Sequence, residues 1–328
     1  MSTTFHPALP PLERQLVATL LRGFPLVPAP FAAVARKCDA SERDVIEAVR
    51  GLIAKGIATR LGAVVRPNTI GASTLAALAC PPSEVVYFGK LITGISGVTH
   101  NYAREHDWLA LWFVVCGQNQ AAVDATLLRI EEMCGRQVIA FPLEREYRID
   151  LGFGFDPHSR VCPPSPAAKA MDVLPIDREI LAEIEDGLPL EPRPYDHVAH
   201  SLGCTEERVR ERLARLLEGG VVKRFGLVVR HRSLGFEANA MVVFAAGSQD
   251  VDDIAQRFLD IPAVTLLYAR RPAPPAWPYR LYAMIHGRKR ADVQAEIREL
   301  LRLAGRPLPH EVLFSTACFK QTGARFSA

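Results

Sequence analysis

The sequence has few of the features that mark a secreted, metal-binding or membrane protein. Its seven cysteines are odd in number, and no two of them form a CxxC pair. A zinc site and a disulfide framework are therefore not expected, and the thiols are expected to be reduced. No apolar run is long enough to cross a bilayer, and residues 1–12 lack the basic and apolar regions of a signal peptide. We therefore expect a cytoplasmic protein with no membrane partner.

The composition is that of an ordinary globular protein. The chain has 328 residues, of which 49% are hydrophobic and 23% charged, enough for two or more domains with their own cores. Its net charge of +3 is too small for the field of the whole chain to favour one class of partner. Local groups of residues must therefore identify the ligand.

The two halves of the chain repeat one pattern. Residues 60–66 (RLGAVVR) correspond to residues 224–230 (RFGLVVR), at a separation of 164 positions that also holds for neighbouring residues. Residues 98–104 (VTHNYAR) are repeated as residues 264–270 (VTLLYAR), where two leucines replace the histidine and the asparagine. The unbroken register of the first pair of segments indicates an internal duplication. The loss of the polar pair from one copy predicts that the halves divide the chemistry between them.

Hydrophobic periodicity predicts the same elements in each half. Three helices within residues 11–55 are followed by a β-hairpin wing at 57–66, which is the winged helix-turn-helix plan. A βαββαβ order typical of a ferredoxin-like domain follows and ends in one strand at 137–148. The predicted fold class is α+β, with two tandem units of this kind. The predicted domains are a winged helix-turn-helix (1–66), a ferredoxin-like domain (67–155), a Pro-rich linker (156–175), a second winged helix-turn-helix (176–230) and a second ferredoxin-like domain (231–328).

A winged helix followed by a βαββαβ domain is the plan of the Lrp/AsnC transcription regulators, but three motifs resemble a more specific family. The first is His100-Asn101-Tyr102, with Arg104 and the strand that contains Trp112. The others are the segments WPYRLYAMIHG at 277–287, which begins within a proline-rich insertion at 271–278, and FKQTGARF at 319–326. Together they resemble the sirohaem (siroheme) decarboxylases in their fused two-subunit form, of the NirD–NirL or AhbA–AhbB type. The sequence departs from that pattern at Arg280, where asparagine is expected.

The resemblance implies an enzyme of heme biosynthesis, a carboxy-lyase. It would convert siroheme to 12,18-didecarboxysiroheme by removing two acetate carboxyl groups, towards d-type heme or along an alternative heme route. The iron-containing tetrapyrrole is then the substrate, and no further cofactor and no protein-bound metal are required. A histidine can nevertheless ligate the substrate's iron. The implied partners are siroheme and other enzymes of the same pathway, and the fused halves are expected to form an internal pseudo-dimer.

Histidines are the candidate catalytic residues. Loss of carbon dioxide from a pyrrole acetate leaves carbanion character, which a positioned imidazolium can protonate. When the two halves are aligned, His286 lies opposite Cys116 and His100 lies opposite Leu266. Each half thus keeps one histidine of a pair. His231, directly after the second wing, is a third candidate.

The substrate implied by the resemblance is a flat polyanion with eight carboxylates, so its site requires guanidinium groups and apolar or aromatic walls. The alternative to a binding role is a structural one: the aromatic residues then lie in the hydrophobic core, and many of the arginines lie on the solvated surface without contact to a ligand. The predicted substrate-binding residues are Asn101, Tyr102, Arg104, Trp112, Arg60, Arg66, Arg148, Arg224, Arg230, Tyr268, Arg270, Arg271, Trp277, Tyr279, Tyr282 and Lys320.

The alternative function is a DNA-binding regulator of the Lrp/AsnC type, either generic or tetrapyrrole-sensing. Each half has a candidate recognition helix, at residues 42–55 and 206–218, and phosphate contacts require cations on such helices. Both helices carry acidic residues among their basic ones, which weakens the electrostatic footprint for DNA. We therefore expect the helical domains to be structural and nucleic acid not to be a partner.

Overall fold

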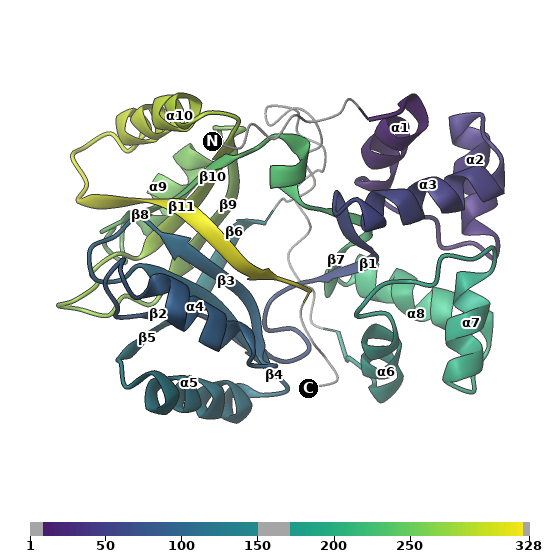
Figure 1. Cartoon of the computed structure of the whole chain (residues 1–328), viewed down its shortest axis with the longest axis horizontal. Helices are drawn as coiled ribbons and strands as arrows, with labels where there is room; N and C mark the ends of the chain where they lie inside the picture. Colours follow the sequence, from purple (N-terminus) through teal and green to yellow (C-terminus); the bar gives the residue numbers. More distant parts are fainter. Residues whose placement is uncertain (1–8, 150–170, 324–328) are drawn as a thin grey trace.

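The computed structural model describes residues 9–149 and 171–323. Figure 1 shows two lobes, one of helices and one built on a large sheet, with strands β1 and β7 between them. Each copy begins in the helical lobe and continues into the sheet lobe, so the chain passes between the lobes more than once. In sequence order, the first copy comprises α1 (Pro11–Leu20), α2 (Pro30–Cys38), α3 (Glu42–Ala54), β1 (Ala58–Val65), β2 (Ala72–Leu78), α4 (Val85–Thr93), β3 (Val98–Arg104), β4 (Leu111–Gly117), α5 (Gln120–Cys134), β5 (Val138–Phe141) and β6 (Leu143–Ile149).

The second copy follows the same order. It comprises α6 (Pro175–Glu183), α7 (Pro194–Ser201), α8 (Glu206–Glu218), β7 (Val222–Val229), a short 3-10 helix η1 (His231–Leu234), β8 (Ala238–Phe244), α9 (Val251–Phe258), β9 (Val264–Arg270), β10 (Leu281–Gly287), α10 (Arg290–Leu303) and β11 (His310–Gln321). The predicted α+β fold of two tandem units is therefore present.

The helical lobe has one hydrophobic core shared by both copies, which includes Leu16, Val49 and Leu213. Equivalent N-caps begin the third helix of each copy: the hydroxyl of Ser41 accepts a hydrogen bond from the N–H of Asp44, and Thr205 caps α8 in the same way. Apolar residues at helical spacing then face the shared core, which makes the two three-helix units one lobe.

The predicted β-hairpin wing at 57–66 is wrong. Each copy contributes a single strand, and β1 pairs antiparallel with β7 of the other copy, with Gly62 opposite Gly226. These glycines are equivalent in the duplication, so the local two-fold axis passes between them. Eight residues are too few for two strands and a turn, and the missing partner strand comes from the other half. A Cβ atom at Gly226 would lie only 2.3 Å from the carbonyl oxygen of Leu20, so glycine is required at this crossing.

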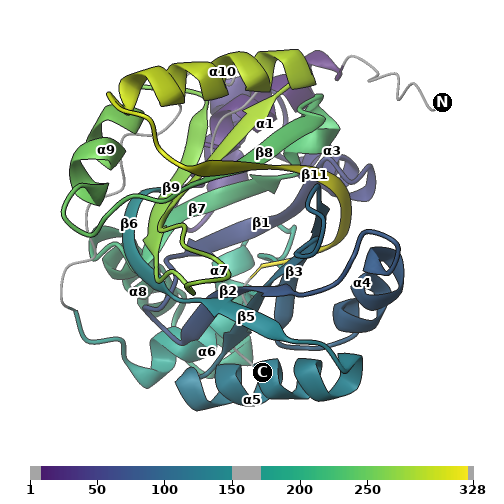
Figure 2. The same ribbon diagram turned by 90° about the vertical axis from the view of Figure 1, so that its left-hand side faces the viewer.

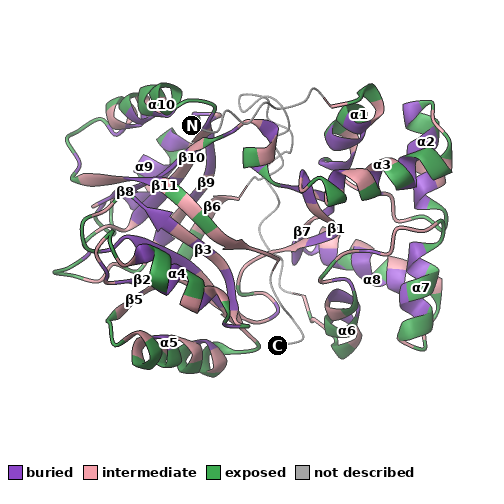
Figure 3. Ribbon diagram, viewed as in Figure 1, coloured by how far each residue is buried: buried purple, intermediate pink, exposed green. Residues whose placement is uncertain are grey.

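The other lobe is built on one sheet of nine strands, in the order β5-β2-β4-β3-β11-β8-β10-β9-β6. Seen from the side of this lobe, its strands curve around the β1–β7 pair, with α4, α5, α9 and α10 on the outside (Figure 2). Helices α5 and α10 are exposed on their outer faces (Figure 3). Two hydrophobic cores, one in each copy, fill the space between these helices and the outer face of the sheet.

The two ferredoxin-like domains exchange their last strands. The single strand predicted at 137–148 is divided at Pro142: β5 pairs with β2 of its own copy, and β6 pairs with β9 of the other copy. The equivalent strand β11 is continuous, and it pairs with β8 of its own copy and β3 of the other. Proline has no N–H for a ladder bond, which explains the break in the first copy. The fused halves therefore form the internal pseudo-dimer that the sequence predicts.

The predicted linker at 156–175 lies mainly outside the described residues, and α6 begins at its last position. The predicted domain boundaries therefore stay predictions. Within the described residues, no helix has the length and apolar character needed to cross a membrane.

Candidate active site

A cavity of about 400 Å³ lies between the inner face of the sheet and the β1–β7 pair. Including its part open to solvent, the empty space between its walls is about 2310 Å³. Both copies supply its walls, since residues of β2, β3 and β4 and of β8, β9 and β10 line it. The cavity therefore belongs to neither half alone.

The alternation of β-strands selects which side chains reach the cavity. His100, Tyr102 and Arg104 line it from β3, and Tyr268 and Arg270 line it from β9. Asn101 lies between the first two and points to the opposite face. There its amide donates hydrogen bonds to the carbonyl oxygen of Gly89 at 2.8 Å and to the hydroxyl of Thr93 at 3.1 Å. This predicted binding residue therefore holds α4 against the sheet.

The cavity wall contains basic side chains and no acidic ones among its described residues. Six arginines and no aspartate or glutamate are among the described residues that line it. Arg66 forms an ion pair with Glu146, which also pairs with Lys223, and Arg60 and Arg224 bond to nearby backbone carbonyls. The six arginines are Arg60, Arg66, Arg104, Arg224, Arg232 and Arg270.

Arg104 and Arg270 are equivalent in the duplication and are held alike. Each guanidinium donates one hydrogen bond to a backbone carbonyl and lies over a tyrosine ring, Tyr102 at 5.7 Å or Tyr268 at 5.0 Å. In the described part of the chain, the Nε atom of each is buried without a hydrogen-bond partner, and neither arginine forms an ion pair. Burial lowers the pKa of both, that of Arg104 to about 10. Both are thus cations suited to an anionic ligand.

His100 is the histidine that the first copy brings to the cavity. Its Nδ1 atom lies 3.1 Å from the hydroxyl of Thr99, and its ring stacks at 6.3 Å on that of Tyr102. Burial, followed by the charge of Arg60, lowers the pKa of His100 to about 4. In the unliganded cavity its imidazole is therefore neutral at pH 7.

The second copy brings two histidines together. The ring centroids of His231 and His286 are 5.6 Å apart, and the Nδ1 atom of His286 lies 2.9 Å from the hydroxyl of Thr265. Burial lowers the pKa of His286 well below its ordinary value, with further lowering from His231 and Arg104. All three histidines predicted from the sequence thus line one cavity.

Several predicted binding residues lie outside the cavity wall. Arg148 donates to three backbone carbonyls at the end of α9 and the start of β9, and the ammonium of Lys320 donates to two at the end of α4. Arg230 and Arg271 are exposed and do not line the cavity. The structure therefore gives the first two a structural contact and places the other two on the surface.

The predicted aromatic residues divide between the cavity and a buried cluster. Trp277 is 1% exposed, and its ring lies 5.3 Å from Trp112 and 6.0 Å from Phe141. Its indole N–H donates to the hydroxyl of Tyr282, while Tyr279 packs on it from the same insertion. Trp112 also lines the cavity, but Trp277, Tyr279 and Tyr282 do not. The cluster packs on the inner face of the sheet beside the cavity.

Other cavity residues were not predicted from the sequence. They share a position on an inward-facing strand or beside one of the histidines, and the alternation of each strand could have identified most of them. They include Thr99, Cys116, Arg232, Asn239, Met241 and Met284.

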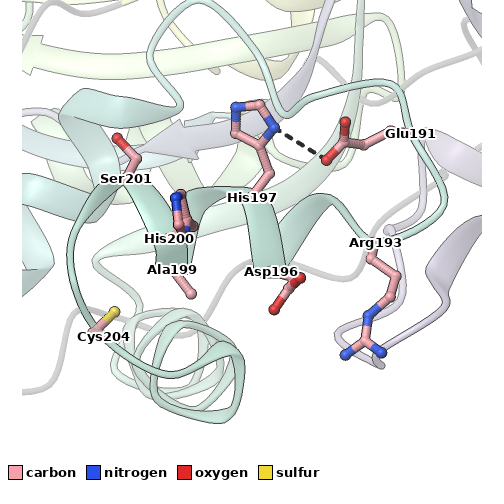
Figure 4. Close-up of a pocket in the computed structure, with 8 residues that line it drawn as sticks. All are labelled: Glu191, Arg193, Asp196, His197, Ala199, His200, Ser201 and Cys204. Atoms are coloured by element: carbon pink, nitrogen blue, oxygen red, sulfur yellow. Dashed lines mark hydrogen bonds and ion pairs between the residues drawn. The ribbon is translucent and has the colours of Figure 1, made fainter.

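A second hollow, of about 430 Å³, lies on the surface of the helical lobe around α7 (Figure 4). The Nδ1 atom of His197 lies 3.1 Å from a carboxylate oxygen of Glu191 there, and the side chain of His197 is 53% exposed. No group of three or more metal-ligating side chains occurs among the described residues. We assign the site to the central cavity, because its arginines and its three histidines converge there from both copies.

Comparison with known proteins identifies relatives along the whole chain. A model of the AsnC-like ligand binding domain matches residues 70–148 and 233–320, and a model of the siroheme decarboxylase NirDL-like HTH domain matches residues 13–57 and 177–222. The siroheme decarboxylase NirDL subunit of Paracoccus denitrificans is 39% identical over 95% of this chain and 96% of its own. The NirL subunit of Stutzerimonas stutzeri is 45% identical over 44% of this chain and 85% of its own. The crystal structure of the siroheme decarboxylase NirDL in complex with an iron-uroporphyrin III analogue has a similar fold, with a TM-score of 0.69 and 22% identity, and covers 95% of this chain and 94% of its own.

Proposed function

Because this chain belongs to the siroheme decarboxylase family in its fused NirDL form, we propose that the central cavity is where it removes two acetate carboxyl groups from siroheme. The product is didecarboxysiroheme, so the enzyme is a carboxy-lyase. Each step breaks one carbon–carbon bond and releases carbon dioxide. The electron pair left on the methylene carbon takes up one proton and yields a methyl group.

The observation that carries this proposal is the composition of the cavity wall. It combines six arginines, no described carboxylate and an apolar surface from residues such as Val114, Leu266 and Met284. A flat macrocycle bearing several carboxylates requires this combination, because its faces are apolar and its edge is anionic. Arg104 is buried and Arg270 is partly buried, and neither has a carboxylate partner in the described part of the chain, so siroheme carboxylates would supply the missing anions.

The histidines would supply the protons. In the unliganded cavity, burial lowers the pKa values of His100 and His286, so both rings are neutral at pH 7. The carboxylates of a bound substrate raise the pKa of a nearby imidazole, because an opposite charge favours its protonated form. Substrate binding would then load a proton onto a histidine, which delivers it to the carbon that loses carbon dioxide.

Both copies contribute a proton donor. His100 comes from the first copy, and His231 and His286 come from the second. We assign His100 and His286 as the donors, since each bonds to a threonine hydroxyl that fixes its ring. His231, 5.6 Å from His286, is the remaining histidine that could relay a proton or ligate the substrate's iron. The tetrapyrrole can delocalise the electron pair, so the proposal includes no further cofactor.

Contacts in the helical lobe reduce the case for a DNA-binding regulator. On α3, Arg50 pairs with Glu47 and donates to the carbonyl oxygen of Leu190. On α8, Arg212 forms a buried bidentate pair with Asp177. These cations stabilise the lobe and are less available to phosphate groups.

The test is anaerobic incubation of the purified protein with siroheme, followed by mass spectrometry of the tetrapyrrole. Loss of two carboxyl groups as carbon dioxide is expected. Siroheme that binds but keeps all its carboxyl groups would support a tetrapyrrole-sensing regulator. Salt-sensitive binding to a promoter fragment, without any binding of siroheme, would support a generic regulator.

A further inference from the structure

Two equivalent threonines lie beside the histidines of the cavity. Thr99 and Thr265 are 1% and 3% exposed, although threonine is usually a surface residue. Each is the extra residue of a β-bulge, because Val98 and His100 pair with consecutive residues of β4, and Val264 and Leu266 pair with consecutive residues of β10. A bulge redirects a side chain and is common next to active sites. Both copies therefore have a β-bulge at the same position, and in each copy the bulge directs a threonine hydroxyl towards a histidine of the cavity.

In the second copy, the hydroxyl of Thr265 has two partners. It donates to the carbonyl oxygen of Met284 at 3.2 Å, and it lies 2.9 Å from the Nδ1 atom of His286. A hydroxyl has one hydrogen and two lone pairs. The carbonyl oxygen can only accept, whereas Nδ1 can donate or accept, so a hydroxyl that serves both partners donates to the carbonyl and accepts from Nδ1, which then carries the imidazole's proton. Burial keeps the ring of His286 neutral, so Nδ1 holds its only ring proton.

We propose that Thr265 is a positioning residue that holds His286 in the Nδ1–H tautomer. The Nε2 atom is then the nitrogen that takes up a proton and delivers it. This inference rests on the proposed role of His286 in decarboxylation, but the tautomer itself is a property of the substrate-free protein.

The first copy shows that the hydroxyl serves the histidine. Thr99 lies 3.1 Å from the Nδ1 atom of His100, which is the next residue along the chain. It also lies 3.7 Å from the sulfur of Cys116, the residue equivalent to His286. The two copies keep their histidine at different strand positions, and in both the threonine hydroxyl reaches its Nδ1 atom. A threonine needed only to build the bulge would not meet Nδ1 in both arrangements.

The first copy holds its histidine less firmly. The carbonyl oxygen that Thr99 would donate to, that of Val114, is 3.5 Å away, against 3.2 Å for the equivalent contact of Thr265. A 3.5 Å contact is long for an O–H···O hydrogen bond. We therefore centre the proposal on Thr265 and His286, and use Thr99 as the matched comparison.

The experiment compares Thr265→Val with Thr265→Ser. Valine keeps the shape of threonine and removes the hydroxyl, whereas serine keeps the hydroxyl. Nitrogen-15 NMR of histidine-labelled, substrate-free protein reports which ring nitrogen carries the proton, and His286→Ala assigns the signals. Wild type and Thr265→Ser should show the Nδ1–H tautomer of His286. Thr265→Val should show the Nε2–H tautomer or a mixture, while Thr99→Val should leave the signals of His286 unchanged.

Activity provides the second readout. Loss of a residue that orients a reactive histidine typically costs about 10–100-fold, so Thr265→Val should lower kcat by that amount and Thr265→Ser should restore most of it. A wild-type His286 in the Nε2–H form, or an unchanged tautomer in Thr265→Val, would overturn the proposal. A correct tautomer in a protein that does not turn over siroheme would instead count against the proposed function alone.

Discussion

At the scale of single residues, the cavity wall carries positive charge that no acidic residue among the described lining residues balances. The Nε atoms of Arg104 and Arg270 are buried, and in the described part of the chain neither arginine has a carboxylate partner. An isolated buried charge is costly, and its cost is offset when an opposite charge binds. The same burial keeps His100 neutral until an anion arrives. Affinity for an anionic ligand and proton uptake therefore have one physical cause.

Replacing either proton donor should slow decarboxylation. General acid catalysis by a positioned side chain contributes about 10²–10⁴-fold, so His100→Ala and His286→Ala should each lower kcat by a factor in that range. His200→Ala, an exposed histidine on α7, is the control. The measurement is the rate of carbon dioxide release under anaerobic conditions. Full activity in both cavity variants would contradict the assignment.

The pKa of His100 also predicts a pH dependence of stability. Its pKa is lowered from 6.5 to about 4 in the folded protein, so the unfolded chain binds a proton at a higher pH than the folded one. The free energy of unfolding must therefore fall as the pH is lowered from about 6.5 to about 4.

His100→Leu removes that dependence and installs the residue found at the equivalent position, Leu266. Between pH 7 and pH 4.5 the variant should lose less stability than wild type, by at most about 3 kcal/mol, since one pKa unit corresponds to about 1.4 kcal/mol. Urea unfolding at the two pH values measures the difference. His200→Leu should behave as wild type, and an equal loss in His100→Leu and wild type would contradict the burial argument.

At the scale of elements, the sequence predicted the local structure well and the pairing of strands poorly. Periodicity identified the helices, and strand alternation is why His100, Tyr102 and Arg104 reach one cavity. The wing was predicted as a hairpin because the partner of β1 is β7, which lies more than 150 residues further along the chain. The contacts of Arg148 with backbone carbonyls could not be predicted either. Every residue has a backbone carbonyl, and the sequence does not show which of them lie near Arg148.

The proline-rich insertion is an element whose role became clear only in the fold. Its Trp277 completes the aromatic cluster beside the cavity and is 1% exposed. Trp277→Ala should lower the free energy of unfolding by about 3–5 kcal/mol, the range for truncating a buried aromatic residue.

Urea denaturation measures that loss. Trp108→Ala, at a site that is 38% exposed, is the comparison and should cost clearly less. Equal effects of the two substitutions would show that the insertion does not stabilise the sheet.

At the scale of the whole molecule, the duplication builds the central cavity from both copies. Strands β6 and β11 each pair with the sheet of the other copy, and β1 pairs with β7. The copies therefore cannot separate without breaking three strand pairings. Once the equivalent positions diverged, the cavity gained a first-copy side with His100 and a second-copy side with His231 and His286.

This exchange predicts how a divided chain behaves. Residues 1–160 and 161–328 produced separately should each lack a strand partner and should aggregate or remain partly unfolded. Produced together, they should form a one-to-one complex that regains most of the decarboxylase activity. Size-exclusion chromatography and the anaerobic assay measure both properties. A stable, active first or second half would contradict the shared cavity.

The central claim is that siroheme binds against the paired arginines of this cavity. The most direct measurement is an anaerobic absorption titration with siroheme of two charge-matched double variants. Arg104→Met with Arg270→Met removes two cations that line the cavity, whereas Arg230→Gln with Arg271→Gln removes two exposed cations outside the cavity. The account predicts a Kd raised about 100-fold or more in the first variant, since hydrogen bonds to charged groups are worth about 1.5–3 kcal/mol each, and a nearly unchanged Kd in the second. Equal changes in Kd for the two folded variants would place the siroheme site elsewhere.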